Sequence, residues 1–158
     1  MERRTEPMEP EALGVLADLC GRIASARRAE FEVALQRAAA RAESMAALED
    51  NWDGEGSPGY QQETLDRAVA LARRSGVAAA DRRLDSALPV PAFAKGPDGS
   101  VDVLWWNADR RLLINVPADD EAPVTFHGFA TGHADRETRG RLPLQADNAW
   151  LVSWLTGA

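Results

Sequence analysis

The chain has 158 residues, of which 45% are hydrophobic and 27% are charged, as in ordinary globular domains. These values exclude a wholly disordered chain and fit one domain, with room for an appended helical arm. The formal net charge of -7 disfavours nonspecific nucleic-acid binding, which depends on Lys and Arg neutralising phosphates. An acidic surface suits solubility or a basic protein partner.

The cysteine count and the apolar runs limit the cellular setting. Cys20 is the only cysteine, so an internal disulfide and a thiolate metal cluster within one chain are excluded. The charged N-terminus has no apolar signal-peptide core, and no apolar run approaches the roughly 20 residues that a membrane helix needs. We therefore expect a cytoplasmic protein with no membrane partner.

The first predicted element is a long helix from about Pro10 to Leu48, a stretch dominated by Ala, Leu, Glu and Arg. Its apolar stripe is interrupted at Arg27 and Arg28, so either one helix changes face there or two helices meet at a bend near Ser25. Such a helix packs against its own domain or against another chain, and we favour self-association. We thus divide the chain into a helical, oligomerising arm (residues 1–48) and an α+β domain (residues 49–158). The apolar stripe consists of Leu13, Leu16, Cys20, Ile23, Phe31, Leu35, Ala38, Met45 and Leu48.

Residues 49–59 form the sharpest break in the chain, because Gly, Pro, Asn and Asp supply turn conformations. We predict a structural loop in which Trp52 anchors in the core while Asn51 and Asp53 accept local backbone hydrogen bonds. Gly54 and Gly56 allow a positive φ there. A second amphipathic helix should follow from about Gln61 to Ser75, with Gly76 as its stop, and residues 77–88 are ambiguous.

From Pro89 the pattern changes to the alternation of β-strands. Short connections favour pairing of neighbouring strands, so we predict a four-stranded antiparallel meander. Residues 131–145 are polar and predicted to be a loop, and a final helix capped by Asp147 or Asn148 should follow. The fold class is therefore α+β, with a long helix, a second helix, the sheet and a C-terminal helix. The predicted strands are Val90–Ala94, Val101–Trp106, Leu112–Val116 and Val124–Phe129.

Two segments carry a family resemblance that covers roughly Leu48 to Val116. The run Asn51-Trp52-Asp53-Gly54-x-Gly56-x-Pro58, a helix, and Asp98-Gly99 followed by Trp105 stand in this order. The chain thereby resembles small bacterial and phage proteins with an NWDGxGxxP loop, a helix and a DGxxxxxW β-hairpin, although one residue here separates Gly56 from Pro58. The resemblance implies this fold and favours a role in toxin neutralisation or defence.

The sequence offers little catalytic chemistry. The acidic loop begins like an EF-hand, but the twelfth position counted from Glu49 is Tyr60 rather than the bidentate Glu that calcium requires. His127 and His133, the two histidines, lack zinc-ligand spacing, and Cys20 on an apolar stripe is by default an inert thiol. We expect no catalytic residues, no metal and no cofactor. The alternative is a small metal- or ligand-dependent enzyme or binding domain that uses residues 50–55.

Arginine pairs and tryptophans supply the candidate binding residues. Trp106 lies beside Arg110 and Arg111, so these three residues are the candidate partner-binding site. Adjacent Trp105 and Trp106 must point to opposite faces of a strand. We favour core packing for Trp106 under Trp150 and Trp154, whereas an exposed Trp106 would mark a binding surface.

We therefore interpret the chain as a non-enzymatic protein-interaction module of the bacterial immunity, antitoxin or defence-accessory kind. Its expected partner is another protein, with self-association through the first helix. A nucleic-acid-binding accessory protein is a further, disfavoured alternative, because the arginines have more numerous carboxylates to pair with.

Overall fold

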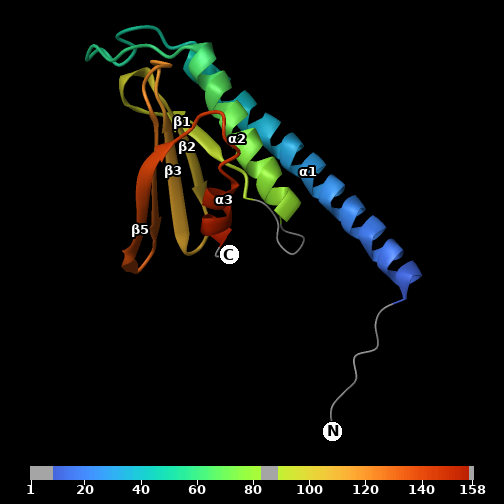
Figure 1. The fold of residues 1–158 in the computed structure, drawn as a ribbon. Helices are drawn as coiled ribbons and strands as arrows, with labels where there is room; N and C mark the ends of the chain where they lie inside the picture. Colours follow the sequence, from blue (N-terminus) through green and yellow to red (C-terminus); the bar gives the residue numbers. More distant parts are fainter. Residues whose placement is uncertain (1–8, 83–88, 157–158) are drawn as a thin grey trace.

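The structure is a computed structural model that describes residues 9–82 and 89–156 (Figure 1). These residues hold three α-helices, one 3-10 turn and five strands. Among them, each helix is too short or too polar to span a lipid bilayer. In chain order the elements are α1 (Pro10–Ala46), α2 (Gln62–Arg82), β1 (Ala92–Lys95), η1 (Pro97–Gly99), β2 (Val101–Trp106), β3 (Arg110–Val116), β4 (Val124–Ala130), β5 (His133–Leu142) and α3 (Ala149–Thr156).

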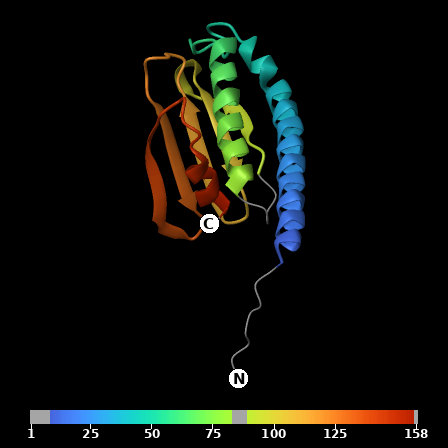
Figure 2. The same ribbon diagram turned by 45° about the vertical axis from the view of Figure 1, so that its right-hand side comes forward.

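The strands form a single antiparallel meander in the order β1-β2-β3-β4-β5. Helices α2 and α3 cover one face of this sheet, while α1 packs against α2 and β1 (Figures 1 and 2). The predicted α+β class, the antiparallel sheet and its two covering helices are confirmed. A sheet with one apolar face requires such a cover.

The prediction of four strands is wrong, because residues 133–142 of the predicted polar loop form β5. This strand pairs with β4 from Val124 opposite Leu142 to Ala130 opposite His133. It is an edge strand in which Arg139 and Arg141 are exposed, so its sequence shows no apolar alternation. Charged side chains on an edge strand also discourage pairing with a further chain.

Helix α2 runs past the predicted stop at Gly76 and ends at Arg82. A Cβ atom at position 76 would lie 2.0 Å from Cζ of Phe31, so this glycine admits the α1 ring rather than ending the helix. Of the ambiguous residues 77–88, those up to Arg82 are helical and the remaining six lie outside the described residues.

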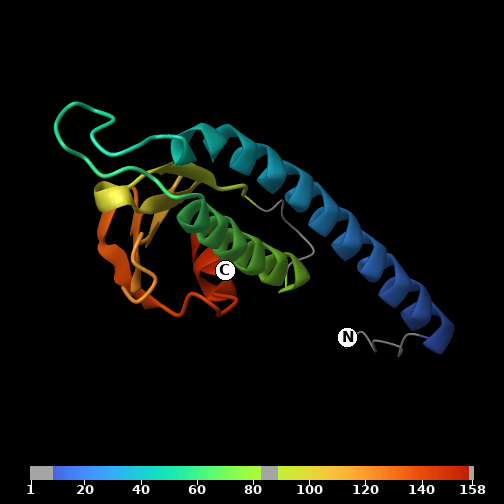
Figure 3. The ribbon, with the colours of Figure 1, turned by 90° about the horizontal axis from the view of Figure 1, so that it is seen from above.

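Helix α1 is continuous through Ser25, which settles the choice between one helix and two. Its C-terminal half contributes Phe31, Leu35 and Met45 to the same core as the sheet. Its N-terminal half extends beyond the end of α2, and Leu13 and Leu16 there are exposed (Figure 3). Among the described residues, the exposed part of α1 is therefore shorter than the arm predicted for residues 1–48.

Candidate protein-interaction surface

Adjacent Trp105 and Trp106 of β2 have opposite surroundings. Trp105 is 1% exposed beneath the helices, and its indole N–H donates to the carbonyl oxygen of Pro89 at 3.2 Å. Trp106 points to the other face of the sheet and is 57% exposed. The favoured prediction of core packing for Trp106 is therefore wrong, because Trp154 lies with α3 on the covered face, where it packs against Gly128.

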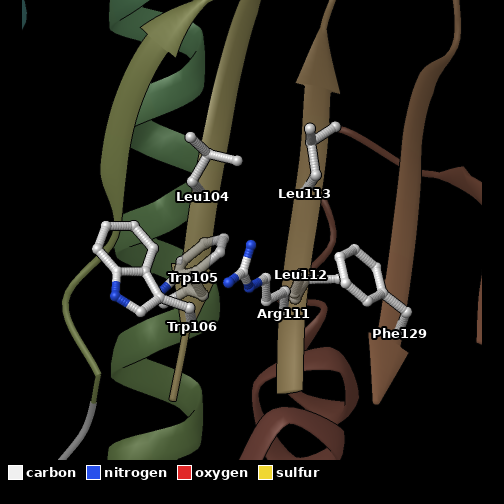
Figure 4. A pocket seen from close by; sticks show the side chains of 7 residues that line it. All are labelled: Leu104, Trp105, Trp106, Arg111, Leu112, Leu113 and Phe129. Atoms are coloured by element: carbon white, nitrogen blue, oxygen red, sulfur yellow. The ribbon is translucent and has the colours of Figure 1, made fainter. Parts of the chain in front are cut away.

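Strand register brings Trp106 together with residues that are distant in sequence. Trp106 lies opposite Arg111, and Arg111 lies opposite Phe129, so the three form a row across β2, β3 and β4. Leu104 opposite Leu113 forms the next row. Figure 4 shows Arg111 between the two rings, with the leucines beside them. We call Leu104, Trp106, Arg111, Leu113 and Phe129 the open-face patch.

The open-face patch lines a shallow hollow of about 410 Å³, to which Trp105 and Leu112 also contribute. Its walls are largely apolar, and Phe129 is 39% exposed. Arg111 adds a guanidinium group, whose five N–H donors match a carboxylate. Aromatic side chains and arginine are the residue types that contribute most to protein–protein binding energy.

The predicted trio is not brought together completely, because Arg110 faces the helices. Its guanidinium carbon lies 5.2 Å from the ring centroid of Trp154, and the group donates to the Trp154 carbonyl oxygen. Arg110 therefore links β3 to α3 through its contacts with Trp154, while Trp106 and Arg111 remain on the open face.

The loop after α1 is held by its own side chains. Asn51 accepts the N–H of Gly56 at 2.8 Å, and Asp53 accepts that of Glu55 at 2.9 Å. Gly54 and Gly56 have φ values of 76° and 88°, which confirms the positive φ predicted for both. The hydroxyl of Ser57, followed by the backbone N–H of Glu55, lowers the pKa of the Asp53 carboxyl below 3.8, because both stabilise the carboxylate.

Trp52 does not anchor this loop in the core, contrary to the prediction. It is 36% exposed, lies 6.2 Å from the ring of Tyr60 and has the Lys95 ammonium 3.8 Å from its own centroid. Tyr60 occupies the core instead, and burial, together with the nearby Asp102 carboxylate, raises its pKa above 10.0.

The two segments of the resemblance meet in space. The Tyr60 hydroxyl donates to the carbonyl oxygen of Gly96 at 2.8 Å. A Cβ at Gly99 would lie 2.8 Å from the Gly59 carbonyl oxygen, so the loop and the hairpin turn approach closely. The acidic loop therefore rests against the η1 turn.

Other candidate chemistry is dispersed. Among the described residues, no three His, Cys, Asp or Glu side chains gather as a metal-ligating group. His127 lies 2.8 Å from a carboxylate oxygen of Glu137 on the open face, and Cys20 is half-buried on α1. The side chain of His133 lies outside what the structure describes.

Comparison of the chain with protein-family models, with curated proteins and with solved structures finds no match. The resemblance to NWDGxGxxP-loop proteins therefore stays a prediction.

Sequence reasoning missed Leu104, Leu113 and Phe129 as members of a surface. Each lies in a predicted strand, but the pattern along one strand does not show which open-face side chains become neighbours across the sheet. The available signal was that β2 and β3 carry apolar residues on both faces of the strand. A sheet with one solvated face needs them on the covered face only.

Proposed function

We propose that this protein is a non-enzymatic interaction module that binds another protein through the open-face patch. The single observation that carries the proposal is the exposure of Trp106 and Phe129 on either side of Arg111, on a sheet face that none of the described helices covers. Large apolar side chains exposed as a contiguous group mark interaction sites.

The composition of the patch favours a particular kind of contact. An apolar side chain of the partner would enter the hollow between Trp106 and Phe129, and a carboxylate beside it would pair with Arg111. The protein's net charge of -7 favours a partner that is basic overall, and this charge difference would accelerate association.

Within this proposal, the biological role is that of a bacterial cytoplasmic immunity protein, antitoxin or defence accessory. Neutralising a basic effector by covering its surface would require a binding face but no catalytic group. The acidic loop offers less support for a metal-dependent role, because the Asp50, Asn51 and Asp53 side chains already accept backbone N–H groups of the loop.

The test compares tagged wild-type protein with Trp106→Ala, both expressed in the native host and identified with their partners by mass spectrometry. We expect one stoichiometric partner with the wild type and at least a tenfold loss with Trp106→Ala, since hot-spot truncation costs about 2 kcal/mol or more. Trp52→Ala is the matched control, because it removes another partly exposed tryptophan, which lies beside Lys95 and does not line the hollow.

The outcomes are distinct. Loss of the partner with Trp106→Ala but not with Trp52→Ala supports the proposal. Equal retention by both variants, or the recovery of no partner at all, contradicts binding through this face.

A further inference from the structure

The N-terminal part of α1 carries an apolar stripe that the other described elements leave partly exposed. Helix α2 pairs with the other half of α1, and near its C-terminal end Asp81 pairs with Arg28. Residues 10–27 run on past this point for about 27 Å at 1.5 Å per residue (Figures 1 and 3). We call this segment the overhang.

The overhang presents the same helix face that packs in the core farther along. Leu13 and Leu16 are 51% and 44% exposed, while Cys20 and Ile23 are half-buried. At 100° per residue these positions fall on the face that holds Phe31 in the following turns. An apolar face that continues an established packing surface is a natural site for another helix.

One charged residue lies at each end of this stripe, and the two charges are opposite in sign. In the order Glu9, Leu13, Leu16, Cys20, Ile23 and Arg27, successive spacings alternate between four and three residues, as in a coiled-coil seam. Asp18 and Arg22 pair with each other on the opposite side of the helix. The seam therefore has an acidic end, an apolar middle and a basic end.

We infer that the overhang pairs with the overhang of a second copy of this chain in antiparallel orientation. This orientation places Leu13 opposite Ile23 and Leu16 opposite Cys20, each counted twice by the two-fold symmetry. The same register places Glu9 opposite Arg27 at both ends of the seam. A parallel pair would instead place Glu9 opposite Glu9 and Arg27 opposite Arg27, which is repulsive.

The first test is the mass of the full chain in solution, followed by sedimentation equilibrium across the micromolar range. We expect reversible association to twice the chain mass of 17.1 kDa. Leu16→Glu should weaken this association at least about tenfold, because a charge replaces a leucine that the helix pair would bury. Val33→Glu is the matched control, since Val33 is 49% exposed on the far side of the same helix and should leave association unchanged.

Circular dichroism and the unfolding midpoint should be the same for Leu16→Glu and wild type at concentrations where both are monomeric. A wild type that stays monomeric throughout, or equal association by Leu16→Glu, overturns the inference. Trp106→Ala should associate like wild type, so failure here is separable from failure of the open-face proposal.

Orientation is tested by oxidative crosslinking with copper phenanthroline. Because Cys20 lies opposite Leu16 in the antiparallel seam, Leu16→Cys should form a disulfide-linked dimer with Cys20, whereas wild type should not. Leu16→Cys combined with Cys20→Ser is the control and should not crosslink. Efficient crosslinking of wild type through Cys20 alone indicates a parallel pair and overturns the antiparallel arrangement.

Discussion

The two faces of the sheet are built from the same strands but have different surroundings. On the covered face, Trp105, Leu112 and Ile114 are each 1% exposed beneath α2 and α3. On the open face, Trp106 and Phe129 remain exposed, with Arg111 between them. Covered apolar area stabilises the fold, whereas uncovered apolar area is available to a partner. Adjacent residues of one strand can therefore have different roles, since one stabilises the fold while the next is available for binding.

The largest expected difference in stability between the two faces lies at the adjacent tryptophans. We expect Trp105→Ala to lower the free energy of unfolding by about 3–5 kcal/mol, because it leaves a cavity and removes a buried aromatic group. Trp106→Ala should lower it by about 1 kcal/mol or less, since most of its ring already contacts water. Urea denaturation followed by circular dichroism measures both. Similar losses for the two variants would mean that the open face is packed in solution.

A single added methyl group gives an intermediate test. A Cβ at Gly128 on the covered face would lie 2.8 Å from the Trp154 ring. Gly128→Ala should therefore cost about 1–3 kcal/mol by overpacking, against the usual preference of strands for alanine over glycine.

The neighbouring substitution Phe129→Ala on the open face is the control for Gly128→Ala. It removes the whole phenyl ring but should cost only about 1 kcal/mol, because the ring is already partly solvated. Chemical denaturation of both variants in one buffer makes the comparison direct. If Gly128→Ala is neutral, α3 is not packed tightly on the sheet.

The sequence predicted the covered face well, because period-two alternation of Val101, Val103 and Trp105 reports burial on one side of a strand. The same alternation predicted four of the strands, while helix-favouring composition and the helical spacing of apolar residues predicted the order of the helices. It did not predict β5, whose charged edge gives no alternation. It also placed the end of α2 at Gly76, since the Phe31 ring that requires this glycine lies on another helix.

The candidate site was predictable only in part. Trp106 and Arg111 are predictable as neighbours because they lie close together along one hairpin. Phe129 joins them through strand register, which depends on pairing between β3 and β4 rather than on local pattern. Whether Trp106 was covered depended on which face α3 would occupy, and the pattern of α3 itself does not decide that.

The smallest expected effect lies at the border of the open face. His127 and Glu137 lie 2.8 Å apart, with side chains 49% and 45% exposed. Exposed contacts of this kind, which are ion pairs only when the imidazole is protonated, contribute about 0–1 kcal/mol, so Glu137→Gln should change the free energy of unfolding by less than about 1 kcal/mol. The measurement is urea denaturation at low and high salt, with Glu63→Gln on α2 as a charge-matched control. A loss above about 2 kcal/mol would show that this part of the open face is desolvated, as a covered face is, because only a desolvated charged pair gives so large a loss when one partner is removed. A change of less than about 1 kcal/mol in the free energy of unfolding would mean that these side chains contribute little to stability and are available to bind a partner.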